Sequence, residues 1–185
     1  MKYEDDKYYH VYNRGANRQD IFRGRGDYGL CLHLFRKYLS QYRVSIMAYC
    51  LMPNHYHLLL RQNDGGSISR FLQTVFNAYT QAINVSTGHS GTLFQGRAKG
   101  LEITSDEYAA RLARYIHYNP VAAGMVLKPE TWEYSDYRDW SGIRKADLSD
   151  LTLRDRYCEN PLEYRSLMDE YVVDREISRF TLEGE

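Results

Sequence analysis

The sequence predicts an α+β fold built on an antiparallel sheet, and three features of the chain lead to this prediction. Short runs rich in β-branched and aromatic residues alternate with longer segments whose apolar residues recur at helical spacing. Two of the short runs, residues 44–51 and 55–61, are separated only by a Met-Pro-Asn turn, which predicts a hairpin. The elements follow one another as strand, helix, strand, strand, helix, strand, which is the order of a split βαβ, ferredoxin-like fold.

The first half of the chain is expected to hold three strands and one helix. Residues 8–14 are rich in tyrosine and valine and stop at a glycine, as an initial strand would. A helix is expected over residues 27–42, because Asp27 can cap it and its apolar side chains recur at helical spacing. Residues 44–51 and 55–61 follow as the two strands of the hairpin.

The chain is expected to continue with a helix over residues 67–85, a strand over 97–103 and an added helix over 104–119. An Asn-Asp-Gly-Gly break precedes the first of these helices. The added helix opens with the capping sequence Thr-Ser-Asp-Glu. It should end before Pro120, because proline disfavours helical geometry in the residue that precedes it.

Charge divides the chain into two parts. Residues 1–128 carry 16 Lys and Arg against 9 Asp and Glu, whereas residues 129–185 carry 8 against 15. This asymmetry predicts a basic working domain, residues 1–140, followed by an acidic helical C-terminal extension, residues 141–185. Eighteen tyrosines suit stacking on nucleobases, although many tyrosines in any protein lie half-buried on strands.

The cellular location of the protein is predicted from its apolar segments and from its cysteines. No apolar run approaches the ~20 residues of a membrane helix, and the first residues do not form an apolar signal. The cysteines, at positions 31, 50 and 158, are odd in number and form no Cys-x-x-Cys pair. We therefore expect free thiols, no membrane partner and a cytoplasmic location.

His55 and His57 are the first candidates for chemistry. They lie two residues apart in a predicted strand, so their side chains point to the same face, roughly 6.6–6.8 Å apart along the backbone. Two imidazoles at this spacing can bind one divalent metal or one phosphate. The alternative is one histidine satisfied in the core and the other at the surface.

Tyr115 and Asn119 lie four residues apart on the added helix and therefore share one face. If this helix packs against the hairpin, it presents a phenol and an amide oxygen to the two histidines. Such a set can cleave a phosphodiester, with the phenol as nucleophile. Tyr115 also fits an apolar stripe with Tyr108 and Leu112, so a purely structural role is equally consistent with the spacing.

Four segments of the chain share their pattern and order with a known family. They are residues 49–60 (YCLMPNHYHLLL), 91–99 (GTLFQGRAK), 114–124 (RYIHYNPVAAG) and 132–138 (WEYSDYR), and the opening VYNR at residues 11–14 agrees with them. The chain resembles the single-tyrosine HUH transposases, and within them the REP-associated tyrosine transposases. The resemblance covers about residues 8–140.

This resemblance implies a ferredoxin-like fold and a metal-dependent DNA endonuclease and transposase. Tyr115 would attack single-stranded DNA near hairpins of repetitive extragenic palindromes, keep the 5′ phosphate and release a 3′ hydroxyl. His55 and His57 would bind Mg²⁺ or Mn²⁺. Insertion-sequence relatives often place a glutamine ligand one turn after the tyrosine, and Asn119 stands at that position here.

DNA contacts are expected from three basic residues in the matching segments, Arg14, Arg97 and Lys99. Alternation along the strand 97–103 places Arg97 and Lys99 on one face. The structural alternative for each is a solvated surface charge. The resemblance also implies a nucleoid-associated protein and leaves open whether it works as a monomer or as a homodimer.

Two other functions share parts of this pattern. Histidine-triad nucleotide hydrolases also have alternating histidines, but the third alternating position here is Leu59. A domesticated protein that binds hairpin DNA or RNA without cleaving it is the second alternative. Such a binder has no need of His55, His57 and Tyr115 together.

Overall fold

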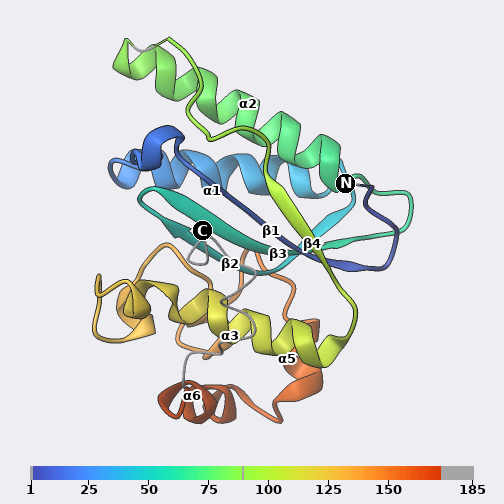
Figure 1. The fold of residues 1–185 in the computed structure, drawn as a ribbon. Helices are drawn as coiled ribbons and strands as arrows, with labels where there is room; N and C mark the ends of the chain where they lie inside the picture. Colours follow the sequence, from blue (N-terminus) through green and yellow to red (C-terminus); the bar gives the residue numbers. More distant parts are fainter. Residues whose placement is uncertain (1, 89, 172–185) are drawn as a thin grey trace.

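The computed structural model describes residues 2–88 and 90–171, which form a four-stranded sheet with helices on both faces (Figure 1). The strands are β1 (Tyr8–Arg14), β2 (Val44–Met52), β3 (His55–Gln62) and β4 (Lys99–Ile103), arranged in the order β2-β3-β1-β4. Every neighbouring pair is antiparallel. This is the split βαβ, ferredoxin-like arrangement, so the predicted fold class is confirmed.

Helices cover the two faces of the sheet. The described helices are α1 (Arg25–Leu39), α2 (Ile68–Thr87), α3 (Asp106–Ala122), α4 (Tyr137–Trp140), α5 (Thr152–Tyr157) and α6 (Pro161–Asp169), with short 3-10 turns η1 (Ala16–Arg18) and η2 (Pro129–Thr131). Figure 1 shows α1 and α2 on one face, and α3, α5 and α6 on the other. Within residues 2–88 and 90–171, no helix combines the length and apolar character that crossing a membrane requires.

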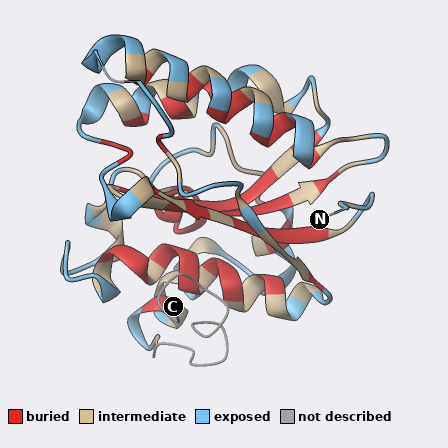
Figure 2. Ribbon diagram, turned by 45° about the horizontal axis from the view of Figure 1, so that its top comes forward, coloured by how far each residue is buried: buried red, intermediate tan, exposed pale blue. Residues whose placement is uncertain are grey.

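The sheet is buried on both sides because its side chains alternate between two apolar clusters. Along β3, Tyr56, Leu58 and Leu60 pack with α1 and α2, whereas Leu59 packs with α3 and the segments after it. Buried residues accordingly line the strands and the inner sides of the helices in Figure 2. The histidine face of β3 is therefore the face that α3 covers.

Helix α2 begins where its sequence predicts and ends at Thr87, two residues beyond the expected end at residue 85. The Ser67 side chain caps the helix by accepting from the backbone N–H of Arg70. Gly88 closes it with φ +63°, a left-handed conformation that glycine adopts without steric cost. Its apolar stripe is buried against the sheet.

The predicted end of α3 is wrong, because the helix passes through Pro120 and continues to Ala122. Backbone hydrogen bonds persist beyond the proline, with the N–H of Ala123 donating to the Asn119 carbonyl at 2.9 Å. Pro120 itself is buried, so tertiary packing overrides its local preference. The carboxamide of Asn119 also donates to the Tyr115 carbonyl at 3.0 Å, within the same part of the helix.

The prediction that Arg97 and Lys99 share a strand face is also wrong. Strand β4 begins only at Lys99, because the chain turns at Gly96, whose φ is +79°. Before this turn, the backbone N–H of Gln95 donates to the Arg14 carbonyl at 2.8 Å, which ties the segment to the end of β1. Alternation along β4 therefore does not extend to Arg97.

The C-terminal part of the described chain packs closely on α3. Leu153, Cys158, Tyr164 and Met168 are buried in the same apolar cluster as the inner face of α3. Residues 172–185 lie outside the described residues. The division of the chain at residue 140 stays a prediction, and the contacts show that α5 and α6 contribute to the core that supports α3.

Candidate active site

Strands β1 and β3 bring three histidines together beneath α3. His57 lies opposite Tyr12 of β1, and His55 lies opposite Arg14, so the two histidines share one face as their spacing predicts. Their ring centroids are 5.1 Å apart at an interplanar angle of 84°. His57 is buried and His55 is half-buried. His10 of β1 lies alongside, with its ring stacked on that of His57 at 5.2 Å.

Hydrogen bonds to the Nδ1 atoms orient both candidate metal ligands. Nδ1 of His55 lies 2.6 Å from the amide oxygen of Asn54, which can only accept, so His55 carries its proton on Nδ1 and its lone pair on Nε2. Nδ1 of His57 lies 3.0 Å from Nε2 of His10. Such second contacts hold a ligating imidazole in place, which assigns a positioning role to His10.

The sequence reasoning missed His10. The sequence does contain a pattern that points to it. His10, Tyr12 and Arg14 alternate along the first strand, so their side chains share a face. What the spacing could not show is that this face meets His57, which is 47 residues away.

Burial keeps the imidazoles neutral. It lowers the pKa of His10 to about 3. Burial, followed by the nearby charge of Arg14, lowers the pKa of His55 to about 4. Burial also lowers the pKa of His57 well below its ordinary value, with smaller contributions from His55 and His10. Neutral imidazole is the form that binds metal ions.

Helix α3 places Tyr115 directly over this group. The ring of Tyr115 meets that of His57 edge-on, with centroids 5.8 Å apart and an interplanar angle of 84°. Tyr115 is buried. A purely structural role as part of an apolar stripe accounts for the burial of Tyr115. It does not account for the contact of its ring with His57, a candidate metal ligand.

Asn119 lies one helical turn beyond Tyr115 and is also buried. Its amide nitrogen donates to the Tyr115 carbonyl, which leaves the amide oxygen as its potential ligand atom. Among the described residues, no three His, Cys, Asp or Glu side chains gather as a metal-binding group. The side chain of Asn119 is hydrogen-bonded to Tyr115, so its role as a metal ligand stays a prediction.

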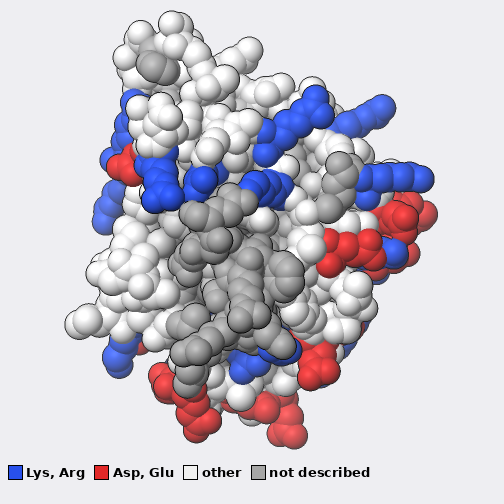
Figure 3. All heavy atoms as spheres, in the orientation of Figure 1, with Lys and Arg blue, Asp and Glu red and all other residues white. Residues whose placement is uncertain are grey.

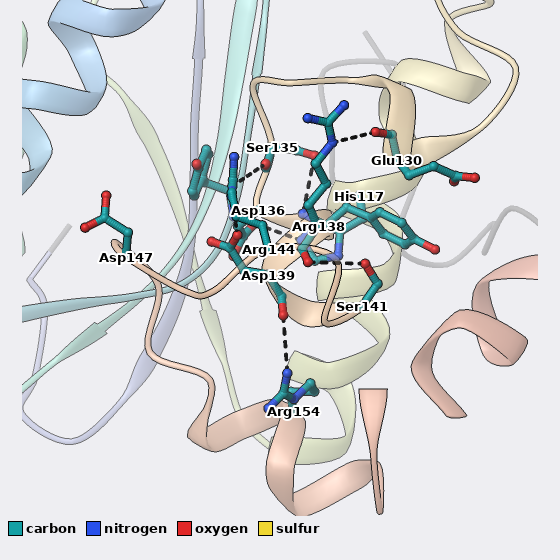
Figure 4. Close-up of polar contacts among 12 residues, drawn as sticks. His117, Glu130, Ser135, Asp136, Arg138, Asp139, Ser141, Arg144, Asp147 and Arg154 are labelled. Carbon is teal, nitrogen blue, oxygen red and sulfur yellow. Dashed lines mark hydrogen bonds and ion pairs between the residues drawn. The ribbon is translucent and has the colours of Figure 1, made fainter. Parts of the chain in front are cut away.

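A buried polar network around His117 and Asp136 anchors α3 to the segment that follows it (Figure 4). His117 is completely buried, with Nε2 2.8 Å from Oδ1 of Asp136 and Nδ1 2.6 Å from the Tyr164 hydroxyl. Oδ1 of Asp136 also accepts from the backbone N–H of Tyr49 in β2, at 2.7 Å. His117 therefore packs inside the protein.

Replacing Asp136 by alanine is expected to lower the free energy of unfolding by about 2–5 kcal/mol, because His117 and the Tyr49 N–H would lose a buried acceptor. Asp136→Asn keeps one acceptor oxygen and should lose less. Urea denaturation measures both changes. The control is Asp147→Ala, which removes an exposed ion pair with Arg36 and should cost less than about 1 kcal/mol. Equal losses for Asp136→Ala and the control would contradict an anchoring role.

The three predicted DNA-binding residues are divided between two faces. Arg14 lies beside His55, and Lys99 lies opposite Tyr12, so both belong to the histidine face. Arg97 instead lines a hollow beside α2. Figure 3 shows Lys and Arg gathered over the upper half of the visible face, whereas Asp and Glu are concentrated lower down.

Comparisons with known proteins relate the chain to one family and its fold to solved structures. A family model described as transposase IS200 like matches residues 4–119. A solved structure described as a REP-associated tyrosine transposase bound to a REP hairpin has a TM-score of 0.65 and 19% identity, covering 83% of this chain and 93% of that chain. A putative transposase from Deinococcus radiodurans R1 has a TM-score of 0.44 and 21% identity, covering 63% of this chain and 95% of that one. Curated proteins gave no match.

The first structural likeness shows a shared fold, and the family match extends over most of the chain. The family that the sequence motifs resemble is thereby confirmed. The chain belongs to the IS200-like transposase family.

Proposed function

We propose that the chain is a metal-dependent endonuclease and transposase that cleaves and rejoins single-stranded DNA near hairpins through a 5′-phosphotyrosine. The observation that supports this most is the position of Tyr115, edge-on to His57 at 5.8 Å on the face that also holds His55. Family membership supplies the class of reaction. The solved relative is described as bound to a REP hairpin, and we propose a hairpin of that kind as the substrate.

In the proposed reaction, the phenolic oxygen of Tyr115 attacks phosphorus. A bond forms between this oxygen and phosphorus while the bond from phosphorus to the 3′ oxygen breaks. The phenol gives up its proton and the departing 3′ oxygen gains one, so the products are a 5′-phosphotyrosine and a 3′ hydroxyl. One phosphodiester replaces another, so the step is reversible and needs no nucleotide cofactor.

The residues fit a divalent metal, because His55 and His57 are held neutral with their Nδ1 atoms engaged. Mg²⁺ or Mn²⁺ bound by these imidazoles, with the Asn119 oxygen or water completing the site, would polarise a phosphoryl oxygen and offset developing charge. The choice of these two metals follows the family resemblance, since imidazole ligands also suit zinc. The chain's own contribution is to hold the phenol beside the two imidazoles.

The test is incubation with labelled hairpin DNA carrying single-stranded flanks and Mn²⁺, read on a denaturing gel. The proposal expects a covalent protein–DNA adduct together with a released fragment ending in a 3′ hydroxyl. Tight binding without any adduct, over a panel of palindromes, would favour the alternative of a domesticated binder of hairpin DNA or RNA. The cluster of buried, neutral histidines beside a phenol is not needed for such binding.

Replacing Arg14 by alanine is expected to weaken hairpin DNA binding about tenfold at low salt. It should also reduce the slope of log affinity against log salt concentration by about one, as loss of one phosphate contact would. Arg14 lies at the end of β1 opposite His55. Fluorescence anisotropy over a salt series measures both quantities. Lys37→Ala is the control, since Lys37 is exposed on α1 across the sheet, and it should change neither. An unchanged salt slope in the Arg14 variant would contradict the phosphate contact.

The remaining assignments are proposals of the same kind. They comprise Asn119 as a metal ligand, Arg97 and Lys99 as DNA contacts, a homodimer, and a cytoplasmic, nucleoid-associated location.

A further inference from the structure

Helix α2 exposes a surface that is almost free of charge. Arg70 is the only charged residue among its twenty. A surface helix normally carries charged residues on its outer face. Here the outer positions bear neutral side chains that can both donate and accept hydrogen bonds, among them Ser69, Gln73, Asn77 and Gln81.

Part of this surface forms one wall of a hollow of about 550 Å³ between α2 and the segment that leads into β4. Figure 1 shows this segment running beside α2. Four aromatic residues line the hollow, namely Tyr3, Tyr56, Phe76 and Phe94. Tyr56 stacks on Phe76 with centroids 4.5 Å apart, and Phe94 meets Phe76 at 5.2 Å. Gln73 and Asn77 contribute amides, and the exposed Arg97 contributes a cation.

A second hollow, of about 460 Å³, lies on the other side of the same segment. Phe94 and Gly96 line both hollows. Arg14 and Arg18 line the second hollow. We call the second hollow the cationic hollow and the first the aromatic hollow.

The segment between the two hollows is fixed to β1. The backbone N–H of Gln95 donates to the Arg14 carbonyl at 2.8 Å, and the amide of Asn13 donates to the Gly96 carbonyl at 3.2 Å. The two hollows are therefore held at a fixed separation. The cationic one adjoins the candidate active site, because Arg14 lies opposite His55.

The hydroxyl of Tyr56 is buried at the wall of the aromatic hollow. The side chain of Asn13, which lines the same hollow, lies within hydrogen-bonding reach of this hydroxyl. The wall of the hollow therefore has a polar pair next to its aromatic rings.

We propose that the paired hollows bind one unstacked nucleotide of the DNA strand, with its base in the aromatic hollow and its phosphate at Arg14 and Arg18. Of the lining rings, Tyr3 and Phe94 are half-buried and can stack on a base, and the amides of Gln73 and Asn77 read its edge. The neutral surface of α2 thereby supplies sequence preference, and the arginines position the strand. This inference rests on the proposed DNA substrate, but it does not require cleavage.

The test compares the wild-type chain with Asn77→Ala and Gln73→Ala. Each protein selects from a fully randomised single-stranded DNA pool, and the bound fractions are sequenced. The wild type should enrich one base at an unpaired position. Both variants should lose preference at that position while keeping any hairpin requirement. Gln81→Ala is the control, since it removes an exposed amide from the same helix outside the hollow, and it should keep the full pattern.

Abasic substitution then measures the site directly. Removing the preferred base from the selected DNA should weaken wild-type binding about tenfold or more, and should affect Asn77→Ala far less. Identical selection patterns in the wild type and both variants would overturn the inference, as would a wild-type pattern confined to paired bases. A protein that selects an unpaired base but forms no phosphotyrosine would keep this inference and overturn the proposed cleavage.

Discussion

Replacing Tyr115 by phenylalanine is expected to abolish the covalent protein–DNA adduct and to lower DNA cleavage by at least about 10³-fold. The substitution removes one oxygen atom from a buried ring and keeps the edge-on packing against His57. Hairpin binding should therefore change little. The adduct is measured on a denaturing gel, and binding is measured separately by anisotropy.

Tyr118→Phe is the matched control for this experiment. Tyr118 lies on the same helix three residues later, and its ring packs against Tyr171 at 5.0 Å instead of meeting His57. Its variant should form the adduct at the wild-type rate. An adduct that persists in Tyr115→Phe would show that another residue is the nucleophile. Loss of the adduct in both variants would indicate a general disturbance of α3.

Replacing His57 by alanine is expected to lower metal-dependent cleavage by at least about 100-fold and to weaken Mn²⁺ binding. His57 lies between His55 and His10, with Tyr115 over its ring, so the substitution removes the centre of the group. His10→Gln should have a smaller effect of about tenfold, because it changes a positioning contact and keeps a side chain that can hydrogen-bond to Nδ1 of His57.

Titration calorimetry with Mn²⁺ and the adduct assay measure these effects together. His33→Ala serves as the control, since His33 is exposed on α1, which covers the opposite face of the sheet. Unchanged Mn²⁺ affinity and cleavage in His57→Ala would mean that the metal binds elsewhere. Weakened affinity with unchanged cleavage would mean that the metal takes no part in the reaction.

Several features of the site could be predicted because they depend on neighbours in the chain. His55 and His57 share a face because a strand alternates with period two, and β3 forms where its apolar run predicts. Helix α2 begins after Ser67 because the side chain of Ser67 caps its first turn locally. In the same way, Ser105 caps α3 by accepting from the backbone N–H of Tyr108.

Predictions failed where a local preference competed with packing. Pro120 opposes helical geometry in the residue before it, yet α3 continues through it because the proline is buried and the following turns keep their hydrogen bonds. Arg97 fits a strand pattern, yet β4 starts only at Lys99, because contacts between residues 94–96 and β1 turn the chain first.

The sequence by itself determined the order of strands and helices, the face shared by His55 and His57, and the family motifs around Tyr115. Only the tertiary structure decided that Tyr115 lies over His57, that His10 contacts His57, and that hollows form on both sides of residues 94–96. The physical reason is the range of the interactions. Alternation and capping act within a few residues. The register of β1 on β3 joins residues 41 or more positions apart, as Arg14 opposite His55 shows, and the packing of α3 brings Tyr115 to His57.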